Sequence, residues 1–347
     1  MNHESDTKRG RNLLAAAGIC SVVLLLPGCA SFSSREPDWV RNPKTVYPED
    51  RFLVAVGEGD TRRAAENVAS ANLSRIFESH IVSDERMVDE VRETTDDFVR
   101  TTDMKTDINI LSSQTLINIQ HAEAWKDDAA RYHAVAYINR RDTAVIYRDR
   151  IEELTARVES LLAQADASED PLGKYARYRA ALLTARENDL LLRQLRVIHP
   201  PTASSVTPPY TIGNIQKAVT ESAGSIRVDI GIEGDAGARI SSSLEELVTG
   251  YGFVAGTPAV LRITGSVAIT DTGQRAAGLA FFRYSLSVQI TDARGNGLVT
   301  INQQGREAVT SPSEAETRCC RTLDNLIRSQ GAQRLDRFFE SLVEHTR

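Results

Sequence analysis

The feature that most constrains this chain is an apolar run close to its amino terminus. Residues 13–26 (LLAAAGICSVVLLL) carry no charge and follow a basic cluster formed by Lys8, Arg9 and Arg11. As a helix this run would extend about 21 Å at ~1.5 Å per residue, whereas the hydrocarbon layer of a bilayer is about 30 Å thick. It is therefore too short for a transmembrane helix and is typical of a signal-peptide core.

The residues that follow place a cysteine at the expected cleavage point. Leu26-Pro27-Gly28-Cys29-Ala30 resembles the bacterial lipobox, with proline at the second position as a small departure. We expect cleavage between Gly28 and Cys29 and covalent lipid, palmitate included, on Cys29. Two or more acyl chains anchor a protein stably at about 0.8 kcal/mol per buried methylene. The alternative is an uncleaved leader with an incidental cysteine.

The residue after the cysteine bears on location. Ala30 stands where an aspartate would retain a lipoprotein at the inner membrane of many diderm bacteria. We therefore expect the bacterial outer membrane, with the protein facing the periplasm or the cell surface. No second apolar run of spanning length follows the leader.

Composition and charge narrow the class of protein further. Apolar residues make up 41% of the chain, enough to bury substantial cores. The net charge is −6, and residues 1–28 hold three basic and two acidic side chains, so the remainder stays acidic. An acidic chain with no visible basic surface has little to neutralise phosphates, and we expect no nucleic-acid partner.

The first half predicts a tether and a small domain. Residues 29–50 are rich in serine and proline and suit a tether that lifts the next domain off the membrane. Residues 51–142 predict an α+β domain in four parts. These are a strand over 52–56 closed by Gly57-Glu58-Gly59, a helix capped by Asp60 or Thr61, and strands at 104–123 and 130–139 joined near Asp127.

Residues 143–198 change to the spacing of packed helices. Their apolar positions recur in steps of four and three, the pattern of a packing seam, at Tyr147, Ile151, Leu154, Val158 and Leu161. A second leucine-rich helix follows a break at residues 168–171, which predicts an antiparallel helical hairpin. Residues 199–210 are rich in proline, serine and threonine and predict a linker.

Residues 211–347 predict a second α+β domain. Its expected elements are a strand at 226–230, a helix at 238–249, strands at 261–269, 282–290 and 298–303, and a final helix with a capping box from Ser313 to Glu316. The predicted fold class is thus α+β: two small domains with antiparallel sheets and packed helices, joined by a long helical hairpin.

Two local patterns have both a chemical and a structural explanation. Gly57-Glu58-Gly59 lies between a strand and a helix, as in a dinucleotide fingerprint, but the third glycine is missing and a tight turn is favoured. His121 and Glu123 lie two apart on a strand and are expected to share a face, with Asp127 and Asp128 nearby. A metal site needs three or four converging ligands, so a solvated strand end is favoured.

The chain also lacks the H-E-x-x-H, G-x-S-x-G and P-loop patterns. We therefore expect no enzyme: no catalytic residues, no metal, and no cofactor apart from the lipid on Cys29. A hydrolase whose catalytic residues are dispersed along the chain stays open as a third, less favoured class.

Trp39 and the late cysteines leave alternatives open. Trp39 could contact a partner, although packing on its own domain is favoured because large aromatics are usually buried. Cys319 and Cys320 have Cα atoms about 3.8 Å apart, closer than the ~4.4–6.8 Å of an unstrained disulfide. One buried and one half-exposed thiol are expected, with a bridge to another chain as the alternative. The hairpin could be self-contained or a partner-binding groove.

Pro37-Asp38-Trp39-Val40, followed by FLVAVGEGDTRRAAENVASANLSRIF at residues 52–77, resembles the Lpp-twenty surface-lipoprotein family and the related amino-terminal domain of a flagellar assembly protein. The resemblance implies a helix packed on an antiparallel sheet. It implies no enzymatic activity or cofactor, and it offers no catalytic residues to carry over. The hairpin and the carboxy-terminal domain fall outside it. Residues 226–310 are similar, by order of elements alone, to penicillin-binding-protein activators and curli-secretion-type lipoproteins.

Together these patterns predict a non-enzymatic lipoprotein that acts as a binding or assembly scaffold in the cell envelope. Its expected partners are the membrane, through the lipid, and other envelope proteins whose identity the sequence does not name. A homo-oligomer is left open. The alternative is a regulator that docks on a cell-wall synthase or on a secretion or flagellar machine.

The anchor generates the first prediction. Native protein should carry acyl mass on Cys29 and fractionate with outer membranes, because two or more acyl chains hold it there. A Cys29→Ala variant should lose the added mass and become soluble. Intact mass and membrane fractionation of both proteins test this, and two soluble, unmodified proteins would show that the lipobox interpretation is wrong.

Overall fold

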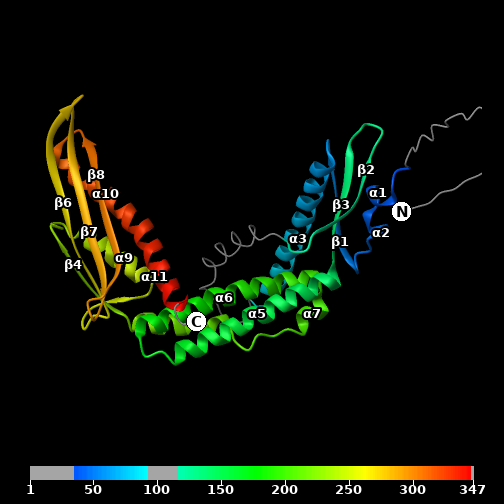
Figure 1. Cartoon of the computed structure of the whole chain (residues 1–347), viewed down its shortest axis with the longest axis horizontal. Helices are drawn as coiled ribbons and strands as arrows, with labels where there is room; N and C mark the ends of the chain where they lie inside the picture. Colours follow the sequence, from blue (N-terminus) through cyan, green and yellow to red (C-terminus); the bar gives the residue numbers. More distant parts are fainter. Residues whose placement is uncertain (1–34, 93–115, 345–347) are drawn as a thin grey trace, which may run out of the picture.

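The computed structural model describes residues 35–92 and 116–344. In Figure 1, two α+β units rise from the same side of a long helical hairpin, one near each of its ends. The predicted α+β class is confirmed. Three predicted features lie outside the described residues: the signal peptide, Cys29, and the first part of the strand expected at 104–123. No helix in the described ranges combines the length and apolarity needed to cross a bilayer.

The first unit packs one long helix on a three-stranded antiparallel sheet with strand order β1-β3-β2. Its elements are α1 (Asp38–Arg41), α2 (Pro43–Val46), β1 (Phe52–Gly59), α3 (Arg62–Arg92), β2 (Gln120–Lys126) and β3 (Tyr132–Asn139). Ala134, Ala136 and Ile138 alternate along the central strand β3 and are fully buried. Val135 is fully buried as well, so burial alone does not show the period of two. The alternation is seen in the contacts: Ala136 and Ile138 belong to the core shared with α3, whereas Tyr137 between them contacts Tyr47.

The opposite face of this sheet is covered by the short helices α1 and α2. Tyr137 points to that face, and its ring centroid lies 5.0 Å from that of Tyr47, the residue that ends α2. The segment predicted as a tether therefore becomes part of the first unit from α1 onward.

Gly57-Glu58-Gly59 continues strand β1, so the predicted turn is wrong. Neither glycine has a positive φ. A Cβ at Gly57 would lie 2.1 Å from the backbone nitrogen of Ala69 and 2.4 Å from the carbonyl oxygen of Ala65. The strand needs glycine because α3 packs directly on its backbone. Thr61 caps α3, one of the two predicted caps, by accepting a hydrogen bond from the backbone nitrogen of Ala64 at 3.1 Å.

The predicted hairpin is formed by two antiparallel helices, α5 (Arg140–Asp166) and α6 (Pro171–Ile198). Each is about 40 Å long at ~1.5 Å per residue. Asp170 caps α6 by accepting from the backbone nitrogen of Gly173 at 2.8 Å, and Pro171 takes the first helical position. All five predicted seam residues of α5 are buried.

The segment predicted as a linker, residues 199–210, is packed against the hairpin and partly helical. Helix α7 (Pro200–Ser204) starts at the first pair of prolines in this segment, where proline suits the first helical turn. His199 caps it by accepting from the backbone nitrogen of Thr202, and Ala203 is buried in the same core as α5 and α6. Proline thus marks a helix start here, which the composition of the segment could not distinguish from a linker.

The second unit is built on a five-stranded sheet of order β5-β4-β6-β7-β8. Its elements are α8 (Ile212–Gly224), β4 (Arg227–Glu233), α9 (Arg239–Gly250), β5 (Val254–Ala255), β6 (Leu261–Ala276), β7 (Leu279–Asp292), β8 (Gly297–Val309), α10 (Pro312–Leu326), the π-helical turn η1 (Ile327–Gly331) and α11 (Ala332–Glu344). The three long strands are antiparallel, as predicted, whereas β4 runs parallel to β5 and β6 because α9 returns the chain between them.

The N-cap of helix α10 lies two residues before the predicted cap at Ser313. Pro312 is its first residue and Ser311 its N-cap, so the capping box from Ser313 to Glu316 is wrong. The hydroxyl of Thr310 instead donates to Glu314 at 2.7 Å. Proline has no N–H and suits the first helical position, which moves the helix start away from Ser313.

The hydrophobic core of each unit extends into the hairpin. The core of the second unit includes Leu172, Tyr175 and Ala176 of α6. The core of the first unit includes Tyr147 of α5 and Leu195 of α6. Each end of the hairpin is therefore part of the core that it carries.

Gly57 supports a stability prediction. Gly57→Ala should lower the free energy of unfolding by about 1–3 kcal/mol, because the added methyl overlaps backbone atoms of α3 that have no rotamer to escape into. Gly213→Ala is the control: it lies in helix α8 with no atom near its Cβ and should be neutral or slightly stabilising. Chemical denaturation measures both, and equal effects would contradict the packing argument.

Candidate functional site

Trp39 lies inside the first unit. Its side chain is only 3% exposed, and its indole nitrogen donates to Oε2 of Glu123 at 3.2 Å. The indole therefore fastens α1 to strand β2. This corresponds to packing on its own domain, one of the two alternatives, and it leaves almost no tryptophan surface for another protein.

His121 and Glu123 are separated by a bulge. The pairing of β2 with β3 shifts between His121 and Ala124, so an extra residue is inserted there. His121 consequently faces α3, where its Nε2 lies 2.8 Å from the hydroxyl of Ser70, whereas Glu123 faces Trp39 on the other side. The expectation that His121 and Glu123 share a face is wrong, because alternation along a strand holds only where the pairing is regular.

Ser70 and His121 lie between β2 and α3. Nε2 of His121 is also 3.2 Å from the carbonyl oxygen of Glu66. The pair joins β2 to α3.

Asp127 is held within the turn between β2 and β3. Its carboxylate accepts from the backbone nitrogen of Arg131 at 2.8 Å and lies 3.1 Å from Nε2 of His133. The hydrogen bond from His133, followed by that from Arg131, lowers the pKa of Asp127. Among the side chains that the structure describes, no three His, Cys, Asp or Glu residues form a metal-binding group.

Cys319 and Cys320 are both buried in α10, with 0% and 8% exposed. The expected half-exposed thiol is therefore wrong. Burial raises the pKa of Cys319 to about 11 and also raises that of Cys320. Both thiols are protonated at neutral pH and pack as small apolar side chains.

Arg140 joins the first unit to the hairpin. It is the first residue of α5, and its Nε donates to the carbonyl oxygen of Glu49 at 2.8 Å. Its Nη1 donates to the carbonyl oxygens of Val197 at 2.7 Å and Ile198 at 3.0 Å, which belong to the last turn of α6. One guanidinium thus satisfies the open end of α6 and fixes it to the chain that enters β1.

A second polar joint lies between α6 and the second unit. Arg179 of α6 donates to Oδ1 of Asp336 on α11 at 2.7 Å, and the hydroxyl of Tyr251 donates to the same oxygen at 2.8 Å. The guanidinium of Arg179 also lies 5.6 Å from the centre of the Tyr251 ring. Burial, followed by the hydrogen bond to Asp336, raises the pKa of Tyr251.

Aromatic packing surrounds this second joint. The ring of Tyr175 lies 4.9 Å from Phe253 and 5.1 Å from Phe339, both in edge-to-face geometry. Its hydroxyl donates to the carbonyl oxygen of Tyr251 at 3.3 Å. Tyr175 comes from the hairpin, so the hairpin supplies the centre of this cluster. In the sequence, the only signal of this aromatic cluster is a tyrosine on the apolar side of a helix.

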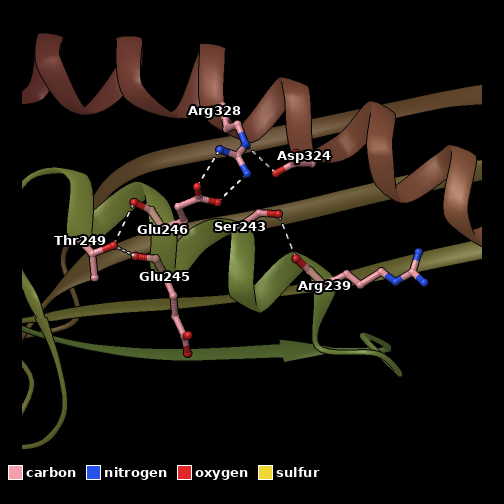
Figure 2. Close-up of polar contacts among 7 residues, drawn as sticks. All are labelled: Arg239, Ser243, Glu245, Glu246, Thr249, Asp324 and Arg328. Atoms are coloured by element: carbon pink, nitrogen blue, oxygen red, sulfur yellow. Dashed lines mark hydrogen bonds and ion pairs between the residues drawn. The ribbon is translucent and has the colours of Figure 1, made fainter.

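Figure 2 shows the polar contacts between α9 and the segment formed by α10 and η1. Arg328 donates to Glu246 at 2.9 Å and to Asp324 at 3.0 Å, so it bridges the two elements. On α9 the hydroxyl of Ser243 donates to the carbonyl oxygen of Arg239 at 2.9 Å. The Arg328 ion pairs are solvent-exposed and stabilise weakly. They hold helices together, and both carboxylates are occupied by the guanidinium.

Each of these arrangements joins two structural elements. The polar clusters join α1 to β2, β2 to α3, α6 to the first unit, α6 to the second unit, and α9 to α10. The two at the hairpin ends were not predicted, because each brings together residues far apart in the sequence.

A model of a known protein family matches one part of the chain. Residues 37–139 match the family model of the LPP20 lipoprotein, which confirms the predicted resemblance for the first unit. The similarity of residues 226–310 to penicillin-binding-protein activators and curli-secretion lipoproteins stays a prediction. No curated protein matches the chain.

Two solved structures are similar to the chain at low sequence identity. The secreted protein HP1454 from Helicobacter pylori is 16% identical, and the alignment covers 82% of this chain and 98% of that one at a TM-score of 0.45. A minor lipoprotein from Acinetobacter baumannii is 14% identical, with 32% of this chain and 89% of that one covered at a TM-score of 0.24.

Alkaline pH can test how much the buried Tyr175 at the second joint contributes to the free energy of unfolding. Burial raises the pKa of Tyr175 from 10 to about 12, so the unfolded chain loses the phenol proton before the folded one. The stability due to the neutral phenol is complete below pH 10 and is lost as the pH rises toward 12. Tyr175→Phe should flatten part of this decline in the free energy of unfolding.

The matched control is Tyr132→Phe, which removes a hydroxyl outside both cores and should leave the decline unchanged. Denaturant titrations from pH 9 to 11.5 measure all three proteins. An identical decline in the wild type and in Tyr175→Phe would contradict the assignment.

Proposed function

We propose that the chain is a lipid-anchored envelope lipoprotein that acts as a non-enzymatic scaffold. The anchor at Cys29 is supported by the lipobox and by the match of residues 37–139 to a lipoprotein family. An outer-membrane location follows the residue after the cysteine, Ala30. The scaffold role is supported by how the two units are attached to the hairpin.

A single observation carries the scaffold proposal: both ends of the hairpin are built into the units that they carry. At one end Arg140 fixes the last turn of α6 to the first unit. At the other end Arg179 and Tyr251 converge on Asp336, beside the aromatic cluster around Tyr175. Attachments of this kind resist bending more than a flexible linker does.

The middle of the hairpin is reinforced as well. Asn188 of α6 is fully buried, and its amide donates to Thr155 of α5 at 2.9 Å and to Tyr210 at 2.7 Å. Tyr210 belongs to the segment that returns along the hairpin toward α8. The two units are therefore held at a set spacing along helices about 40 Å long, which suits simultaneous binding of two envelope components.

The test loosens the joints while it leaves both units folded. The variant Arg140→Gln/Asp336→Asn removes the guanidinium group at the joint with the first unit and the carboxylate charge at the joint with the second unit. Its matched control, Arg141→Gln/Glu340→Gln, makes similar changes at exposed neighbours on the same helices. Photo-crosslinking residues at Arg63 and Gln289, one in each unit, report binding in native membranes.

We expect both positions to crosslink envelope proteins, and the wild type and control to yield an assembly crosslinked through both units at once. The loosened variant should keep each single crosslink but lose at least tenfold of the doubly crosslinked assembly. Its thermal unfolding should stay cooperative. Failure to recover any envelope protein, or an undiminished double crosslink in the loosened variant, would count against the scaffold.

A further inference from the structure

Two arginines, one on β7 and one on β8, lie opposite each other on neighbouring strands of the second sheet. Arg283 of β7 pairs directly with Arg306 of β8. Both side chains lie on the exposed face of the sheet, opposite the helices that cover the other face. Like charges directly opposite one another on neighbouring strands are destabilising, so this pair needs a physical explanation.

Neither arginine has a carboxylate partner within the described residues. Within those residues the guanidinium of Arg283 makes no hydrogen bond or ion pair, although its backbone is paired in the sheet. Arg306 donates to the amide oxygen of Gln274 at 2.8 Å and lies 4.8 Å from the ring centre of Phe281. These contacts orient the guanidinium of Arg306 and leave most of its N–H groups available.

The nearby carboxylate of Asp271 is already occupied. Arg275 donates to both of its oxygens, at 2.9 and 2.7 Å, and the backbone nitrogen of Gly273 donates at 2.8 Å. The hydrogen bond from Arg275, followed by that from Gly273, lowers the pKa of Asp271 to about 2. Asp271 therefore pairs with Arg275, and the charges of Arg283 and Arg306 stay uncompensated.

A cavity of about 300 Å³ lies at this position. It is lined by Thr270, Asp271, Thr272, Gln274, Arg283 and Arg306. Thr270 pairs with Arg283 on the strand next to it, so its hydroxyl lies on the same side of the sheet. Two guanidinium groups and a hydroxyl thus border one cavity on the open face of the sheet. In Figure 1 the end of the sheet where β6 turns into β7 lies far from the helical hairpin of α5 and α6.

From this geometry we propose that Arg283 and Arg306 form a binding site for a phosphate group. Inorganic phosphate offers four acceptor oxygens and more than one negative charge, and a phosphodiester headgroup offers two unbridged oxygens that share one charge, so both can accept charge-assisted hydrogen bonds from the two guanidinium groups. The bound group would replace the repulsion between the arginines with charge-assisted hydrogen bonds. The site goes beyond the scaffold role and does not depend on the anchor at Cys29.

A free phosphate and the phosphate of an anionic lipid headgroup share this chemistry, and the experiment separates them. The full chain is purified in an uncharged detergent and titrated with inorganic phosphate by calorimetry, against chloride at equal ionic strength. In parallel, thermal unfolding is followed in the same micelles doped with phosphatidylglycerol or with zwitterionic phosphatidylcholine.

The test variant is Arg283→Gln/Arg306→Gln. The control, Arg262→Gln/Arg294→Gln, removes one positive charge from β6 and one from the turn between β7 and β8, and neither residue lines the cavity. A second variant, Arg283→Lys/Arg306→Lys, keeps the charges but loses the forks, so it separates binding from folding. The wild type and the control should bind with equal affinity, the lysine variant more weakly, and the glutamine variant at least tenfold more weakly.

Saturable binding of inorganic phosphate with this order of affinities supports the site and a soluble source. Stabilisation by phosphatidylglycerol but not phosphatidylcholine, with the same order, supports the site and a lipid headgroup as its source. If the wild type binds neither probe, or if the control loses as much affinity as the glutamine variant, the proposal is overturned.

Discussion

The structure depends on the packing of α5 against α6, because both α+β units use this hairpin as part of their cores. Tyr147 and Leu195 close the core of the first unit, while Leu172 and Tyr175 enter that of the second. Each fully buried large apolar side chain contributes about 1.5–3 kcal/mol. The hairpin therefore supplies eight of the 18 buried residues in the core of the first unit and three of the 29 in that of the second.

Hydrogen bonds at the two ends of the hairpin then fix how each unit is oriented on it. Apolar contacts are not directional, whereas the hydrogen bonds of Arg140 to the last turn of α6 set its position relative to β1. Asp336 does the same at the other end by accepting from both Arg179 and Tyr251. A charged group that is partly buried between elements stabilises only when its partners are in place, so these contacts favour one arrangement of the units.

The second unit presents two different faces. One is covered by α9, α10 and α11, and the other is an open sheet with alternating polar side chains. Antiparallel sheets commonly face solvent on one side, and polar residues there are expected. Arg283 and Arg306, which have no carboxylate partner among the described residues, go beyond that expectation, since a solvated face has no need for like charges in direct register.

The sequence by itself determined the elements whose pattern is local. The helical seam from Tyr147 to Leu161, the alternation along β3 and β7, and the fold class all follow from the periods of a helix and a strand. The tertiary structure alone decided what depends on contact between distant segments. The bulge that separates His121 from Glu123, the close approach of α3 to Gly57, and the joint at Asp336 each depend on how one element packs on another, which the period of a single element does not encode.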